Sequence, residues 1–215
     1  MNKLDELIQE LCPDGVEYLE LAKVAKFKNG FSFKSSKFSD EGYPILRITN
    51  ISNGIIKDNN YVYFHKDDYK EDLTSFVVKE NDIVVAMSGA TTGKVGINKT
   101  GKELYLNQRV GLFIPNEEKI NRFYLYHWLL SKSQLLLEIS TGGAQPNLSS
   151  QKTMQLKLPV PPRPIQDEIV RILNKFTELT TELTTELTAR KKQYEYYRDK
   201  LLAYDKQIPK VKLNE

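Results

Sequence analysis

Residues 158–192 read LPVPPRPIQDEIVRILNKFTELTTELTTELTARKK, and the character of the chain changes within this stretch. Four of its first seven residues are proline. Because proline cannot continue a helix or pair within a central strand, we interpret 158–164 as a stiff connector. We expect it to separate a domain over 1–157 from a long helix over 165–204, with a C-terminal tail over 205–215.

From Ile165 to Tyr204 the sequence contains neither glycine nor proline, and apolar residues recur at steps of three and four. This spacing predicts a helix about 60 Å long with a single apolar seam. A domain of this size cannot cover so long a seam, so we expect a partner helix from a second copy of the chain. We assign eight seam residues to dimerisation: Ile172, Phe176, Leu179, Leu183, Leu187, Tyr194, Tyr197 and Leu201.

The repeat ELTT-ELTT-ELTA at 178–189 lies inside this helix. Its glutamates repel one another at i,i+4 and its threonines are weak helix formers, so packing must stabilise the segment. Two antiparallel copies that cross near residue 184 would bring Glu178 of one chain to Arg190 or Lys191 of the other, whereas a parallel pair would stack glutamate on glutamate.

Two other arrangements of this helix are open, a membrane-surface helix and a helix folded back on its own domain. The segment 165–204 contains seven acidic and seven basic residues, and a membrane-surface helix favours an excess of lysine and arginine. A helix folded back would leave much of the rod overhanging. Self-association is therefore the favoured interpretation.

Before the connector, short apolar runs bounded by turn residues indicate strands. They are YPILRITNIS at 43–52, NDIVVAMSG at 81–89 and RVGLFIP at 109–115. The stretch NRFYLYHWLLSKSQLLLEIS at 121–140 indicates a helix, and a short helix is expected near Leu4–Leu11. The predicted fold class is α+β, with one mixed α/β domain followed by a long helix that forms an antiparallel coiled coil in a dimer.

Composition limits the class of protein. The chain has 215 residues, a net charge of +3 and a single cysteine, Cys12. One cysteine excludes a disulfide framework or a cysteine-rich zinc site, and it is typical of the reducing cytoplasm. The acidic start MNKLDELIQELCPDG is unlike a signal peptide, and no apolar stretch is long enough to cross a membrane. We expect a cytoplasmic protein.

The motifs of common enzymes are missing. SGATTGKVG at 88–96 has only three residues between Gly89 and Gly93 and a valine after its lysine, so it is not a phosphate-binding loop, and we expect a tight turn between two strands. His65 and His127 have no partners at metal-ligand spacing, and the acidic segment KDDYKED at 66–72 indicates a solvated loop. We expect neither metal nor cofactor in this chain, and a binding function rather than catalysis.

Three polar clusters suggest what the domain binds. Between Leu21 and Phe38 stand five lysines and no acidic residue, interleaved with phenylalanine, asparagine and serine. LNQR at 106–109 and TGGAQPNLSSQK at 141–152 add side chains that suit base edges and phosphates. An edge strand protected by lysines explains the first cluster equally well.

The ordered motifs YPILRITNI, NDIVVAMSGATTGKVGI, LNQRVGLFIP, GGAQPNLSSQ and LPVPPRPIQDEIVRIL, followed by the Thr-Glu-Leu repeat, resemble the specificity (S, HsdS) subunit of type I restriction–modification enzymes. Members of that family carry two target-recognition domains, each followed by a long helix. This chain has one of each, so it resembles a half-length subunit.

The resemblance implies a non-catalytic subunit that reads half of a split double-stranded DNA target. It also implies docking of methyltransferase subunits that use S-adenosylmethionine and of a motor–nuclease (restriction) subunit, with the repeat helix as the ruler between half-sites. Two copies joined through antiparallel helices would read an inverted repeat.

The candidate DNA contacts are chosen for their chemistry: Lys28, Asn29, Ser32, Lys34, Ser35, Ser36, Lys37, Arg47, Thr91, Thr92, Lys94, Gln108, Arg109, Gln145 and Asn147. Three alternatives remain open: a DNA-independent assembly scaffold, an enzyme with an unrecognised site, and a shuffled gene fragment that is active only with another half.

Overall fold

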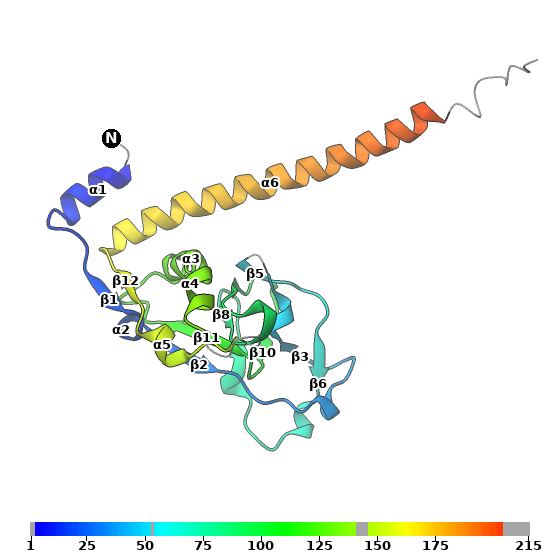
Figure 1. The fold of residues 1–215 in the computed structure, drawn as a ribbon, viewed down its shortest axis with the longest axis horizontal. Helices are drawn as coiled ribbons and strands as arrows, with labels where there is room; N and C mark the ends of the chain where they lie inside the picture. The colour runs from blue at the N-terminus through cyan, green and yellow to red at the C-terminus, as the bar shows by residue number, and fades with distance from the viewer. Residues whose placement is uncertain (1–2, 53, 141–145, 204–215) are drawn as a thin grey trace, which may run out of the picture. The chain divides into compact units, whose positions relative to one another are not determined.

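The computed structural model describes residues 3–52, 54–140 and 146–203, and it divides into two units, residues 1–170 and 171–215 (Figure 1). The first unit is a mixed α/β domain, and the described residues of the second continue one long helix. The predicted mixed α/β domain followed by a long helix is confirmed, and the antiparallel coiled coil in a dimer stays a prediction. No helix within the described ranges has the length and apolar character needed to span a membrane.

Within its described residues, the first unit contains three sheets. In spatial order, the larger one consists of β2 (Ala25–Asn29), β11 (Val110–Pro115), β8 (Ile83–Ala86), β9 (Val95–Ile97), β5 (Gly54–Ile56) and β4 (Ile51–Ser52). The second consists of β6 (Val62–Phe64), β3 (Tyr43–Leu46), β10 (Leu104–Leu106) and β7 (Val77–Val78). The third pairs β1 (Tyr18–Glu20) with β12 (Lys157–Pro159).

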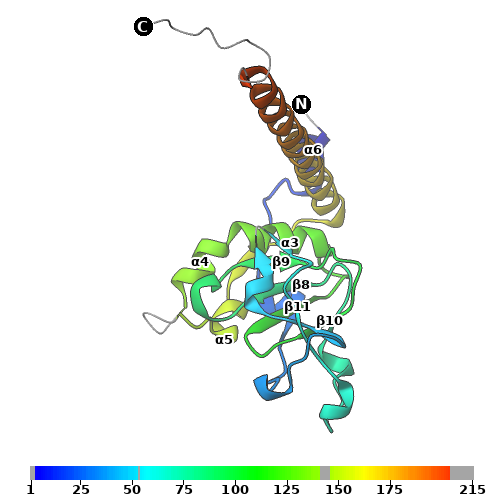
Figure 2. The ribbon, with the colours of Figure 1, turned by 90° about the vertical axis from the view of Figure 1, so that its right-hand side faces the viewer.

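The chain also forms α-helices, and those that follow β11 in the sequence are labelled in Figure 2. The helices are α1 (Lys3–Leu11), α2 (Leu21–Val24), α3 (Arg122–Ser131), α4 (Ser133–Glu138), α5 (Ser150–Met154) and α6 (Arg163–Leu202). The predicted N-terminal helix is thus confirmed as α1. The single helix expected over 121–140 is divided at Lys132, because the Ser131 and Ser133 hydroxyls donate to the carbonyls of Trp128 and Leu130 and compete with the helical ladder.

The predicted strands are confirmed as β3, β8 and β11. Every residue of β8 and every residue of β11 except Ile114 is buried, which explains their apolar sequences, whereas β3 begins with the exposed Tyr43. In β8, Ile83 and Val85 pack into a core with the helices, whereas Val84 and Ala86 pack between the two larger sheets. A third core is largely aromatic and includes Phe33, Phe64 and Tyr105.

The expected connector is organised differently from the prediction. Residues 157–159 pair with β1 as a strand, and α6 begins at Arg163, two residues before the predicted start. Proline is tolerated in both places, at the end of a two-stranded sheet and in the first helical turn, where the missing N–H has no ladder partner. Tyr204, the predicted helix end, and the tail lie outside the described residues.

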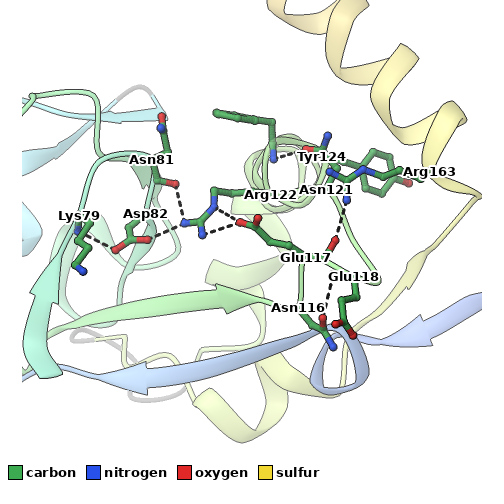
Figure 3. A network of polar contacts seen from close by, with 11 residues as sticks. Lys79, Asn81, Asp82, Asn116, Glu117, Glu118, Asn121, Arg122, Tyr124 and Arg163 are labelled. Carbon is green, nitrogen blue, oxygen red and sulfur yellow. Dashed lines mark hydrogen bonds and ion pairs between the residues drawn. The ribbon is translucent and has the colours of Figure 1, made fainter.

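A polar network fastens the first turn of α6 to the loop before α3. Asn121 caps α3 by accepting from the amides of Phe123 and Tyr124, and its own backbone N–H donates to the side-chain oxygen of the buried Gln166 at 2.7 Å. Beside it, Arg122 bridges Asp82 at 2.7 Å and Glu117 at 2.8 Å (Figure 3). The first two turns of α6 therefore belong to the domain.

From residue 171 onward α6 exposes apolar side chains at the predicted spacing. Phe176, Leu183 and Tyr194 are 64%, 66% and 67% exposed, and the other predicted seam residues from Leu179 to Leu201 are exposed as well; Ile172 is half-buried. All six threonines of 177–188 donate their hydroxyls to the carbonyl four residues earlier. The threonine hydroxyls are therefore hydrogen-bonded within the helix, and the apolar seam remains exposed.

Candidate nucleic-acid interface

The turn between β10 and β11 presents two polar side chains on a fixed backbone. Asn107 accepts from the Arg109 amide through its side chain at 3.2 Å and from the Val110 amide through its carbonyl at 2.8 Å. The Gln108 amide donates to the carbonyl of Phe31 at 2.8 Å, and the Arg109 carbonyl accepts from Met87 at 2.8 Å. The side chains of Gln108 and Arg109 remain exposed.

The glycine-rich segment forms the predicted turn between β8 and β9. Gly89 and Gly93 have φ angles of +78° and +81°, which glycine adopts without strain. Thr92 is buried, and its hydroxyl lies 2.6 Å from the Gly89 carbonyl and 3.1 Å from that of Pro146. In this structure Thr92 holds the turn together and does not reach the surface.

The loop before α5 is tied to the same turn. Asn147 forms a bridge with Ser88, and the Leu148 amide donates to the Met87 carbonyl at 2.7 Å. Ser149 then caps α5 by accepting from the Lys152 amide at 3.3 Å. Asn147 is exposed, whereas Gln145 lies outside the described residues.

These segments enclose two adjoining hollows of about 620 and 510 Å³. Ser88, Gln108, Arg109 and Asn147 line both. The first adds Gly89, Ala90 and Pro146, and the second adds Asn29, Gly30, Met87, Leu148, Ser149 and Ser150. Among the described residues that line them, Arg109 is the only charged one. We call this surface the amide groove.

The groove gathers four of the predicted DNA contacts, Asn29, Gln108, Arg109 and Asn147, from all three polar clusters. Ser88 was not among the predicted contacts; its hydroxyl is buried and has no partner among the described residues. Its position directly before Gly89, at the start of the tight turn, was the available signal.

The remaining predicted contacts of the first cluster lie elsewhere. Lys28 donates to the carbonyl of Ser75 and covers the ring of Phe76, and Lys37 donates to the carbonyl of Asp68 and covers Tyr69. Ser32, Lys34 and Lys37 line a separate hollow of about 490 Å³ that also contains Asp68 and Glu71. Ser35 and Ser36 form an exposed single turn beside it.

Lys28 and Lys37 of the basic segment therefore contact residues 65–76, which we call the acidic arm. The arm carries four acidic residues, Asp67, Asp68, Glu71 and Asp72, and two lysines, so its net negative charge opposes only part of the charge of the five lysines. The strand that begins the segment, β2, lies at the edge of the larger sheet, as the alternative interpretation of its lysines required.

The last three predicted contacts differ in accessibility. Arg47 is half-buried and donates to the carbonyl of Asn60 at 3.2 Å, so it holds two loops together. Thr91 is half-buried, with its hydroxyl 3.4 Å from the Ile48 carbonyl. Lys94 is exposed next to the glycine turn. No group of three or more His, Cys, Asp or Glu that could hold a metal ion occurs within the described ranges.

A family model described as the type I restriction modification DNA specificity domain matches residues 13–192. The chain belongs to this family. The resemblance inferred from the motifs is thereby confirmed for most of the chain, including the groove and the repeat helix.

Individual specificity subunits match over different lengths. The MjaVIII subunit of Methanocaldococcus jannaschii is 33% identical over 155 residues, covering 69% of this chain and 36% of the relative. The EcoprrI subunit of Escherichia coli is 32% identical over 228 aligned positions, covering 95% of this chain and 54% of the relative. The chain thus spans between about a third and a half of these relatives, all named as specificity subunits.

Solved structures of the family share the fold. An HsdS subunit from Thermoanaerobacter tengcongensis matches with a TM-score of 0.62 at 16% identity, covering 85% of this chain and 44% of that one. An S subunit from M. genitalium matches with a TM-score of 0.59 at 17% identity, covering 89% and 47%. This chain corresponds to less than half of the length of each matched chain.

Proposed function

We propose that this chain is a half-length DNA specificity subunit whose amide groove reads one half of a split DNA target. The observation that carries the proposal is the groove itself, where Asn29, Gln108, Arg109 and Asn147 converge without an acidic side chain among the described lining residues. Amides and a guanidinium are the groups that pair with the edges of adenine and guanine.

The second part of the proposal is an antiparallel homodimer through α6. The exposed seam supports it, because a row of apolar side chains at steps of three and four is stable when a second helix covers it. Crossing near residue 184 would place Glu178 beside the partner's Arg190. A dimer with a recognition domain at each end would read an inverted repeat.

Catalysis is assigned to partner subunits. The sequence lacks the Asn/Asp-Pro-Pro-aromatic tetrad of an amino-methyltransferase, so we place S-adenosylmethionine and the flipped adenine in a methyltransferase partner. DNA cleavage belongs to a motor–nuclease partner. Both subunits would dock on the dimer in the cytoplasm.

Mapping methylated adenines tests the whole proposal. The chain is expressed with its methyltransferase partner in a host that lacks adenine methylation, and the modified motif is read by sequencing. We expect a split motif whose halves are inverted repeats. An asymmetric split motif would contradict the homodimer and leave DNA reading in place.

Binding measurements separate the alternatives. DNA reading requires affinity that falls steeply with salt and prefers one sequence, whereas a scaffold would bind DNA weakly and without sequence preference. Light scattering of the isolated chain distinguishes a true half subunit, which forms a uniform dimer, from a fragment that awaits a different half.

A further inference from the structure

We propose that Arg109 is the base-reading residue of the amide groove and that it recognises a guanine, while Lys94 at the rim contacts a phosphate. This assignment rests on the proposed function. It adds which side chain selects the base sequence of the bound DNA and which only increases the affinity for DNA.

The Arg109 side chain is available to bind a ligand, whereas the backbone at residue 109 is held by hydrogen bonds. Its backbone amide donates to the Asn107 side chain at 3.2 Å and its carbonyl accepts from the Met87 amide at 2.8 Å, so two hydrogen bonds hold the position of its Cα. Its guanidinium has no hydrogen bond or ion pair within the part of the chain that the structure describes. Arg47, by contrast, already donates to a carbonyl of the domain.

The other described side chains that line the groove with Arg109 are uncharged. They are amides and hydroxyls, among them those of Asn29, Gln108 and Asn147, together with apolar side chains such as those of Met87 and Leu148. A site for a phosphate backbone gathers several cations, because each phosphate carries a full charge. A single arginine among neutral donors and acceptors is instead typical of a site for base edges.

The planar guanidinium presents two parallel N–H groups that match the O6 and N7 acceptors of guanine, and no other side chain pairs with guanine in this bidentate way as often. Gln108, the neighbouring residue on the turn, has the donor and acceptor that match adenine. The turn therefore suits two adjacent purines, with Arg109 on the guanine.

Lys94 provides the contrast within the same surface. It is exposed next to the glycine turn that lines the groove, and it does not line either hollow. A flexible ammonium outside the base-reading surface contacts phosphates as a point charge and carries no sequence information.

Arg109→Lys and Lys94→Ala are the matched pair that tests this assignment. The chain, assembled with its methyltransferase partner, is bound to DNA in which one half-site position at a time is varied, over a series of salt concentrations. For Arg109→Lys we expect the preference for guanine at one position to fall by roughly 5- to 150-fold, with other positions and the salt dependence unchanged. For Lys94→Ala we expect equal weakening for all sequences and a salt slope reduced by about one.

Two results would overturn the assignment alone. In one, Arg109→Lys weakens every sequence equally, which would make Arg109 a phosphate contact. In the other, it changes neither preference nor affinity. If the unsubstituted assembly shows no sequence preference at all, the proposed function fails, and the role of Arg109 with it.

Discussion

At the scale of single residues, Gly30 lets the basic segment approach the turn between β10 and β11. A Cβ on this residue would lie 2.1 Å from the Asn107 carbonyl oxygen, which is backbone and cannot rotate away. Asn107 precedes Gln108 and Arg109 in this turn, and its side chain accepts a hydrogen bond from the Arg109 amide. The absence of a side chain at residue 30 is therefore part of the groove.

Gly30→Ala tests this close approach. We expect it to lower the free energy of unfolding by about 1–3 kcal/mol, because the turn must shift to admit the methyl group. Urea unfolding followed by tryptophan fluorescence measures the effect. Ser32→Ala, at an exposed neighbour, is the control and should remain within about 0.5 kcal/mol of the original protein. Equal stability of the two variants would contradict the crowding.

Two tyrosines differ in hydrogen bonding and share a raised pKa. The Tyr124 hydroxyl donates to the Pro159 carbonyl at 3.0 Å, whereas the buried Tyr61 hydroxyl has no partner among the described residues. Burial raises the pKa of each phenol to about 12. At neutral pH we expect Tyr124→Phe to lower the free energy of unfolding by about 0.5–1.5 kcal/mol and Tyr61→Phe not to lower it.

The same two phenols predict a loss of stability in alkali. Since the folded state holds their protons more tightly than the unfolded state, their contribution is complete below pH 10 and is lost as the pH rises from about 10 to about 12. Thermal unfolding at stepped pH measures this fall, and Tyr61→Phe should reduce it. An unchanged fall in Tyr61→Phe would show that this phenol does not contribute.

At the scale of elements, the repeat in α6 separates helix formation from helix pairing. Six threonine hydroxyls donate to carbonyls of their own helix, for example Thr184 to Thr180 at 2.7 Å, so none of these hydroxyls requires a partner chain. Each four-residue unit adds about 6 Å of helix. The number of units can therefore change without altering the chemistry of the helix.

Inserting one further ELTT unit after Thr185 tests the role of helix length. We expect the gap between the two halves of the methylated motif to grow by about one to two base pairs, because about 6 Å corresponds to that many steps of DNA. Adenine methylation mapping gives the result. Thr181→Ala keeps the length and should keep the gap; an unchanged gap after the insertion would contradict a ruler.

At the scale of the whole molecule, the two units present different surfaces. The domain carries the amide groove, and α6 carries an apolar seam beyond residue 170. The network around Asn121 and Gln166 secures the first turns of α6 to the domain, since Gln166 also donates to the Pro161 carbonyl at 2.8 Å. Reading and pairing can therefore be altered independently.

Leu183→Lys tests pairing through the seam. A dimer would lose two buried leucines near its centre, so we expect association to weaken by about 100-fold or more. Light scattering over a range of concentrations measures this loss. Thr185→Lys places the same charge on another side of the helix and should leave the dimer intact. A dimer that persists in Leu183→Lys would exclude the seam as the interface.

The sequence by itself determined the elements and the family. Spacing of three and four over 165–201 was enough for the long helix, and apolar runs were enough for β3, β8 and β11, because these patterns depend on near neighbours along the chain. The ordered motifs around the glycine turn and LNQR were enough for the resemblance. The exact start of α6 and the break at Lys132 depend on local hydrogen bonds that periodicity does not report.

Only the tertiary structure decided which polar residues act together. Asn29, Arg109 and Asn147 come from three distant segments, and the pairing of β2 and β8 with β11 brings them to one groove. The same packing places Lys28 and Lys37 against the acidic arm, although in sequence they look as available as Arg109. The physical reason is that strand register and loop contacts join residues far apart in the chain, and local composition contains no record of them.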